Sequence, residues 1–258
     1  MARVISDLSI SETDRQPQSP ICRSISAMGI HGIWYCTGIM VMPMPHAPAR
    51  LQYSVTALMV YEACPLQYYY TFVKRIPPPR SRAMETGVSI HKLIADHFVQ
   101  PPLLPPEFEP ELQDLLEAFR ISRFNVAPIM IERAFVLPLE RADLRGRIDV
   151  VLPRAAGGLE VVDFKSGTTR PQQDLDANLQ LPLYALAVSR LFDCPPGEIA
   201  YTYFFLRDRV EVSFQPTAES MQKVTRRVDG ILDAIQAEQF RPAVGCSCYA
   251  CRRERRSR

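Results

Sequence analysis

Residues 161–167, Val-Val-Asp-Phe-Lys-Ser-Gly, combine an apolar strand pattern with an acid and a base two positions apart. Side chains alternate across a strand, so Asp163 and Lys165 share one face while Val162 and Phe164 occupy the other. A carboxylate beside an ammonium is either a routine ion pair on an exposed sheet face or part of a site that binds a cation and moves protons. The segment by itself leaves both interpretations open.

A predicted hairpin brings a second carboxylate to the first. Strands are expected at 143–153 and 159–165, joined by a loop rich in Ala and Gly. If the hairpin is centred near Ala156, Asp149 faces Asp163 directly, with the two Cβ atoms roughly 5 Å apart. Two carboxylates this close repel each other unless a proton, a cation or a lysine intervenes, and Mg²⁺ satisfies both.

The alternation also predicts one apolar and one charged face for this hairpin. The apolar positions are Leu144, Ile148, Val150, Leu152, Val162 and Phe164. The charged positions are Arg145, Arg147, Asp149, Asp163 and Lys165. On the charged face Lys165 is expected beside the cation, where it orients or deprotonates a water molecule.

Two predicted helices carry further polar candidates. His91 follows Gly87 by about one turn, and Gly87 permits close backbone approach at a helix start, although a lone helical histidine is more often a surface or core residue. Gln180 and Tyr184 lie one above the other at i and i+4. They are either an exposed polar pair or a pair that steadies Lys165 and contacts a nucleic-acid strand.

The bulk properties fit one domain. The chain has 258 residues, 47% hydrophobic and 22% charged. We expect residues 1–49 to be a disordered or poorly packed extension and residues 50–258 to form the domain. No run of 18 or more purely apolar residues occurs, so neither secretion nor a membrane span is expected.

Periodicity and breaker residues predict an α/β or α+β fold, in which helices flank a mixed sheet. Helices are expected at 54–73 (two short ones, broken at Cys64-Pro65), 85–99, 109–122, 172–191 and 217–238. Strands are expected at 130–139, 143–153, 159–165, 199–206 and 209–214. A cysteine-bearing coil is expected at the C-terminal end.

The motifs occur in a recognisable order. They are Gly87-x-x-x-His91, Gly146-Arg147-Ile148-Asp149, Asp163-Phe164-Lys165-Ser166-Gly167 and Gln180-x-x-x-Tyr184. This order resembles the PD-(D/E)xK nuclease superfamily, in particular RecB-type nuclease domains, AddB-type nucleases and the CRISPR-associated adaptation exonucleases. The resemblance implies a restriction-endonuclease-like core that hydrolyses DNA with a bound metal ion.

The resemblance also implies roles for individual residues. The implied metal ligands are His91, Asp149, Asp163 and the backbone carbonyl of Phe164. Lys165 is implied to position or activate the attacking water, while Gln180 and Tyr184 orient the lysine and contact DNA. Glu132 lies where relatives often carry an acid and is a weaker candidate.

The implied activity is that of a deoxyribonuclease that uses Mg²⁺ or Mn²⁺ on single strands or duplex ends, in DNA repair or recombination. Arg145 and Arg147 are expected to contact phosphates. No Gly-x-x-x-x-Gly-Lys-Ser/Thr loop is present, so a helicase motor would come from another chain. The alternatives are a nuclease subunit that is active only with a helicase partner, and a non-catalytic DNA-binding module.

Seven cysteines are few for this length and odd in number, which favours a reduced cytoplasmic setting with some thiols reserved for a metal or cluster. The resemblance implies a [4Fe–4S] cluster held by Cys64, which precedes a proline, and by Cys246, Cys248 and Cys251. The Cys-x-Cys spacing is tight for a cluster. Zn²⁺ bound by four thiolates, or no metal, therefore remains an alternative.

Overall fold

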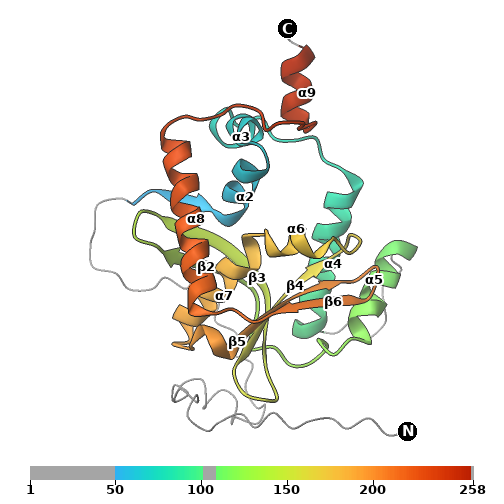
Figure 1. Ribbon diagram of the computed structural model, residues 1–258. Coiled ribbons are helices and arrows are strands. Elements are labelled where there is room, and N and C mark those ends of the chain that lie inside the picture. The colour runs from blue at the N-terminus through green and yellow to red at the C-terminus, as the bar shows by residue number, and fades with distance from the viewer. Residues whose placement is uncertain (1–49, 101–108, 257–258) are drawn as a thin grey trace, which may run out of the picture.

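The computed structural model describes residues 50–100 and 109–256 (Figure 1). The predicted extension, residues 1–49, lies outside this part of the chain. A six-stranded mixed sheet forms the centre of the molecule, and helices flank it. The predicted class, a mixed sheet flanked by helices, is confirmed.

The sheet is built around its longest strand. The strands are β1 (Gln52–Ser54), β2 (Met130–Pro138), β3 (Asp143–Pro153), β4 (Leu159–Lys165), β5 (Ile199–Phe205) and β6 (Val210–Phe214). They are ordered β1-β3-β4-β5-β6, and β2 also pairs with β3. The pairs β1–β3 and β4–β5 are parallel and the others are antiparallel. The short β1 was not predicted, because three residues are too few to show a period.

The helices follow the predicted order closely. They are α2 (Val55–Ala63), α3 (Pro65–Tyr68), the π-helical turn η2 (Tyr69–Val73), α4 (Arg82–Val99), α5 (Pro110–Arg120), α6 (Gln172–Asp176), α7 (Gln180–Leu191), the 3₁₀ turn η3 (Pro196–Glu198), α8 (Ala218–Gln236) and α9 (Tyr249–Arg256). Each helix in the described part of the chain is too short or too polar to cross a lipid bilayer.

Two helix predictions need correction. The helix expected at 172–191 is divided into α6 and α7, because the Asn178 side chain accepts a hydrogen bond from the backbone N–H of Gln180 (2.8 Å) and favours a local turn. The predicted C-terminal coil is partly helical, since Cys251 lies in α9. The first correction matters for the site, because it places Gln180 at the first residue of α7.

The hairpin register is confirmed from Val150 to Pro153, but the ladder ends there and the predicted direct pairing of Asp149 with Asp163 does not form. Val150 pairs with Val162 and Val151 with Val161, which is the register expected for a hairpin centred near Ala156. The predicted charged face is not one continuous surface, because Arg145 and Arg147 are exposed whereas Asp149 and Asp163 are buried. β4 is buried on both faces from Leu159 to Phe164, because two hydrophobic clusters enclose the sheet.

The two clusters divide the hairpin differently from simple alternation. One cluster includes residues of α2, α7 and α8 together with Leu144 and Ile148. The other includes residues of α4 and α5 together with Val150, Val162 and Phe164. The faces of β3 therefore exchange near Asp149, so that apolar positions before and after it pack into different clusters.

Candidate active site

The edge of β3 that β4 occupies is shared by two strands. β1 pairs with residues 143–145 and β4 with residues 150–153. Residues 146–149, Gly-Arg-Ile-Asp, lie between these two ladders, while β2 runs along the opposite edge. The separation of β1 from β4 frees the end of this segment, where Asp149 reaches across to β4.

Asp149 and His91 both bind the backbone of one residue on β4. The Asp149 carboxylate accepts a hydrogen bond from the N–H of Phe164 (2.9 Å). The Nε2 atom of His91 lies 2.8 Å from the carbonyl oxygen of Phe164. These contacts fix helix α4, which carries His91, against the end of β4.

The other ring nitrogen of His91 faces two carboxylates. His91 Nδ1 is 3.3 Å from Asp149 Oδ2 and 3.7 Å from Glu132 Oε1. Ligand atoms of His91, Glu132 and Asp149 all lie within 4.8 Å of one another. Two carboxylates and an imidazole form a donor set suited to Mg²⁺ or Mn²⁺.

Glu132 reaches this group through an unusual backbone conformation. Its φ is +44°, the left-handed region that non-glycine residues seldom adopt. The neighbouring pairs Ile131–Val150 and Arg133–Ile148 are regular, so the irregularity is confined to Glu132, opposite Asp149. Such strain costs roughly 1–3 kcal/mol and is concentrated at functional sites. Glu132, only a weak candidate from the sequence, is therefore one of the three converging side chains of the site.

A second polar group extends from β4 to α7. Lys165 Nζ lies 2.5 Å from Asp163 Oδ2 and donates to Gln180 Oε1 (2.9 Å). Gln180 Nε2 donates to the other oxygen of Asp163 (2.6 Å). The lysine ammonium also lies 5.6 Å from the ring centroid of Tyr203, a residue that the sequence analysis did not single out. Lys165 is therefore held from three directions.

The two polar groups influence each other electrostatically. Burial raises the pKa of Asp163 to about 6, with Lys165 opposing the rise and the charge of Asp149 adding to it. Burial lowers the pKa of His91, but hydrogen bonds to Asp149 and Glu132 outweigh it and raise this pKa to about 10. Without a metal ion, His91 is thus protonated at neutral pH and neutralises part of the carboxylate charge.

The remaining predicted residues occupy different positions around this site. Tyr184 is buried and packs edge-to-face on Phe135, with ring centroids 5.3 Å apart, so its ring is not exposed for stacking on a base. Its hydroxyl lies 3.5 Å from Gln180 Nε2. Arg145 and Arg147 are exposed, and Arg147 Nη1 lies 3.5 Å from Glu132 Oε2.

Close packing requires glycine at one of the two motif glycines, Gly146, and not at the other, Gly87. A Cβ atom on Gly146 would lie 2.5 Å from Cζ of Phe135, which is too close for any larger residue without rearrangement. A Cβ atom on Gly87 would lie 3.5 Å from Ser166 Oγ, an ordinary contact. The sequence predicted Gly87 at the start of a helix, but it lies inside α4, and a larger residue there would fit without a clash.

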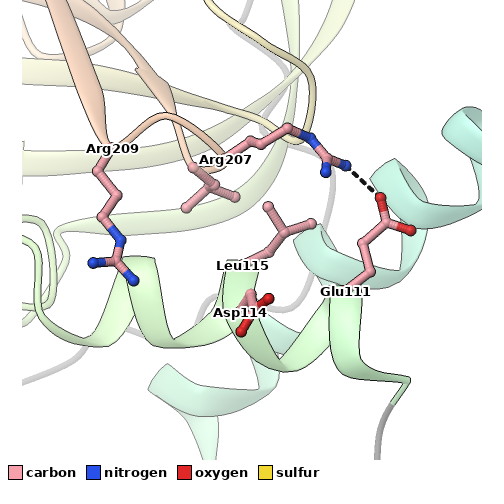
Figure 2. A pocket seen from close by; sticks show the side chains of 6 residues that line it. Glu111, Asp114, Leu115, Arg207 and Arg209 are labelled. Carbon is pink, nitrogen blue, oxygen red and sulfur yellow. Dashed lines mark hydrogen bonds and ion pairs between the residues drawn. The ribbon is translucent and has the colours of Figure 1, made fainter.

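A separate cavity of about 560 Å³ lies between α5 and the turn that joins β5 to β6 (Figure 2). Its lining residues are Glu111, Asp114, Leu115, Leu206, Arg207 and Arg209. Arg207 forms an ion pair with Glu111 across it. None of the motif residues lines this cavity, so we place the candidate active site at His91, Asp149 and Lys165 instead.

Four cysteines from the two ends of the described chain form a second candidate metal centre. The Sγ atoms of Cys64, Cys246, Cys248 and Cys251 all lie within 4.8 Å of one another, and those of Cys64 and Cys251 are 3.6 Å apart. Burial raises the pKa of Cys64, but backbone hydrogen bonds and the neighbouring thiols lower it to about 7. Burial raises the pKa of Cys248 and of Cys251, so a metal bound by these four converging thiols would have to displace the protons of those two.

Comparisons with known proteins bear on the family and the fold of the chain. The family model described as "PD-(D/E)XK nuclease superfamily" matches residues 52–125 and 106–256. A crystal structure of a "putative exonuclease" from Eubacterium rectale superimposes with a TM-score of 0.53 at 13% identity, covering 78% of this chain and 86% of that one. This likeness shows a shared fold.

A crystal structure of the protein SSO0001 gives a TM-score of only 0.38 at 17% identity, covering 73% of this chain and 78% of that one. No curated protein sequence matches the chain. The family model spans nearly all of the described residues, including every motif of the candidate site. This chain belongs to the PD-(D/E)XK nuclease superfamily.

Proposed function

We propose that this protein is a metal-dependent deoxyribonuclease that cuts single strands or duplex ends, as an exonuclease in DNA repair or recombination. The observation that carries the proposal is the convergence of His91, Glu132 and Asp149 beside the Asp163–Lys165–Gln180 chain. One group suits a divalent cation and the other suits proton transfer, which are the two requirements of phosphodiester hydrolysis.

Each residue has a distinct part in this mechanism. His91, Glu132 and Asp149 would hold Mg²⁺ or Mn²⁺, and Asp163 and the Phe164 carbonyl would be further ligands. When bound, the ion polarises the scissile phosphate and stabilises the charge that develops in the transition state. Lys165 orients the attacking water or accepts its proton.

Supporting residues set the geometry of that lysine. Gln180 binds both Lys165 and Asp163, so it fixes the distance between the ammonium and the carboxylate. Tyr184 orients Gln180 through its hydroxyl. Arg145 and Arg147 extend from the exposed side of β3 and contact phosphates of the bound DNA.

We further propose that the cysteine centre holds a metal and joins the two ends of the domain. This arrangement supports the relation to RecB-type and AddB-type nucleases and to the CRISPR-associated exonucleases, in which a [4Fe–4S] cluster is implied. The Sγ atoms of Cys64 and Cys251 are 3.6 Å apart. This is close to the sulfur–sulfur distance around a single tetrahedral ion, about 3.8 Å for metal–sulfur bonds of about 2.3 Å. Such thiolates suit a reducing, cytoplasmic setting.

The occupant of that centre has a direct test. Anaerobically purified protein with a [4Fe–4S] cluster absorbs broadly in the visible range and contains about four irons per chain, whereas a single Zn²⁺ gives a colourless protein with one zinc per chain. Protein that contains neither metal and has four titratable thiols in this centre would contradict the proposal.

The nuclease function is tested with end-labelled DNA, with and without Mn²⁺. We expect metal-dependent cleavage by the wild type and loss of cleavage in Lys165→Ala with DNA binding retained. Lys223→Ala, at an exposed position of α8, is the matched control and should cleave normally. If Lys165→Ala still cuts, the assigned mechanism is wrong. If the wild type binds DNA but cuts only after a helicase is added, the partner-dependent alternative holds; binding without cleavage under either condition indicates a non-catalytic module.

A further inference from the structure

A basic segment connects the cysteine centre to the helix that carries His91. Residues 72–82, which we name the strap, read Phe-Val-Lys-Arg-Ile-Pro-Pro-Pro-Arg-Ser-Arg. They contain four cationic side chains and no acid. In Figure 1 the strap is the coil that leaves the α3 region near the base of α9 and descends to α4.

The strap is fixed at the cysteine centre by its backbone. The N–H of Ile76 donates to the carbonyl of Tyr70 (2.8 Å), and its carbonyl accepts from the hydroxyl of Tyr249 (2.7 Å). Tyr249 lies between Cys248 and Cys251 in the sequence, so the centre and the strap share an anchor.

The other end of the strap is fixed at α4. Ser81 is the N-cap of the helix and accepts from the N–H of Met84 (3.3 Å), while Arg82 pairs with Glu109 (3.2 Å). Between the two anchors, three consecutive prolines favour a stiff, extended backbone. The strap is therefore anchored at both ends, and most of its residues are exposed.

Two arginines of the strap are exposed and unpaired. Within the described part of the chain, the side chains of Arg75 and Arg80 make neither a hydrogen bond nor an ion pair, and both residues are exposed. Arg75 also has a φ of +57°, a strained conformation for a residue with a side chain. Exposed cations on a stiff backbone suit a polyanion, because the backbone is already ordered and loses little conformational entropy on binding.

Apolar side chains accompany these cations. Phe72 and Val73 precede Arg75 and are 38% and 49% exposed, and Met84, just past the strap, is 51% exposed. Unpaired bases offer apolar faces to such side chains, whereas paired bases are stacked inside a duplex. The combination of cations and exposed apolar groups favours a single strand over a duplex.

The position of the strap links it to the candidate active site. Arg82 begins α4 and His91 follows nine residues later, a distance of about 14 Å along the helix axis at 1.5 Å per residue. We propose that the strap binds the phosphate backbone of single-stranded DNA and directs the strand to the metal site, an inference that rests on the proposed nuclease function. Arg75 and Arg80 contact phosphates, and Phe72 contacts a base.

The test compares two pairs of exposed cations. The strap variant is Arg75→Asn/Arg80→Gln, in which asparagine is chosen because it tolerates positive φ. The control is Lys223→Gln/Arg226→Gln on α8, where neither cation has a partner among the described residues. Binding of a fluorescein-labelled 20-nucleotide dT strand is followed by anisotropy in EDTA at several salt concentrations, and cleavage is measured separately with Mn²⁺.

Two lost phosphate contacts have a quantitative signature. Each contact contributes about 0.7 to the slope of log K against log salt for a single strand, so we expect the strap variant to lose about 1.4 in slope. The corresponding loss of affinity is at most roughly 65-fold at 50 mM salt and roughly 10-fold at 200 mM. The control variant should bind like the wild type or lose much less.

The outcomes separate the two proposals. If the wild type binds and cuts the strand while both variants match it in affinity and salt slope, the strap inference is overturned and the nuclease function stands. If the strap variant shows the expected loss but the wild type never cuts, the strap inference stands and the nuclease function fails. Tighter wild-type binding to an RNA strand than to DNA would overturn the assignment of DNA as its ligand.

Discussion

Gln180 offers the sharpest test of how the site is organised. Its side-chain oxygen accepts from Lys165 (2.9 Å) and its nitrogen donates to the buried Asp163 (2.6 Å). Replacing it with leucine removes both hydrogen bonds but retains the volume and the helix. The lysine keeps its ion pair with Asp163, so we expect it to become less well oriented and to stay in the site.

The size of the effect follows from these contacts. A hydrogen bond to a charged group contributes about 1.5–3 kcal/mol, which corresponds to a factor of roughly 10 to 150 in rate if it is needed in the transition state. We expect Gln180→Leu to lower the single-turnover cleavage rate within this range while DNA affinity changes little. Lys165→Ala should be more severe, because it removes the reacting group itself.

Gln180→Glu separates chemistry from packing. The new carboxylate retains an acceptor for Lys165 but places a second negative charge beside Asp163, and like charges this close share a proton. Burial and Asp149 already raise the pKa of Asp163 to about 6, and the glutamate should raise it further. Acidic metal ligands work as carboxylates, so the pH at which activity is half-maximal should move upward relative to the wild type.

Single-turnover rates from pH 5.5 to 9, measured with saturating Mn²⁺ and quenched in EDTA, check both variants. Circular dichroism melts confirm that each variant is folded. A Gln180→Leu rate within twofold of the wild type, or a Gln180→Glu profile that coincides with that of the wild type, would refute the role assigned to Gln180.

Three further predictions follow from other contacts. Mn²⁺ binding at pH 7.5 should release about one proton, because His91 has a pKa of about 10 before metal binding. Calorimetry in two buffers of different ionisation enthalpy should show this release in the wild type and not in His91→Gln. Arg123→Met should lower the free energy of unfolding by roughly 2–3 kcal/mol, less than for a fully buried pair, because Arg123 is 50% exposed although Glu160 is buried. Burial would raise the pKa of Glu160, but hydrogen bonds from Arg123 and Thr202 outweigh it and lower this pKa. The stability difference between wild type and Arg123→Met, measured by urea titration, should therefore be present above pH 4.5 and shrink as the pH falls below 4.5. Cys64→Ser should lose the bound metal and at least about 3 kcal/mol of stability, or roughly 6 °C or more in Tm, and an unchanged metal content and Tm would count against the cysteine centre.

Local patterns were sufficient for most of the elements and for the hairpin register. The turn near Ala156 and the apolar alternation specify which residues of β3 and β4 face each other, so the pairing of Val150 with Val162 could be predicted. The division of the helix at Asn178 could not, because its signal is a single side-chain bond competing with a strong helical period.

The exposure of the hairpin could not be predicted from its own residues. Asp163 and Lys165 alternate with apolar side chains as they would on a solvated face, but α7 covers them and Asp163 is only 1% exposed. Which helix covers a sheet face depends on contacts distant in the sequence. The same limit applies to Tyr203, which reaches Lys165 through the parallel pairing of β4 with β5.

Glu132 shows the limit most clearly. Its side chain joins the site because its backbone adopts a positive φ opposite Asp149, and glutamate has no intrinsic preference for that conformation. The candidate site could therefore be located from the motif residues, while the full set of possible ligands required the fold.

The central claim is that a divalent cation binds between His91, Glu132 and Asp149. Anomalous diffraction from crystals grown with Mn²⁺ tests it most directly. We predict a peak with ligand distances of roughly 2.0–2.3 Å to His91 and the two carboxylates in the wild type, and no peak there in Asp149→Asn. A peak elsewhere in the molecule, or an undisturbed hydrogen bond between Asp149 and Phe164 with no ion beside it, would contradict the account.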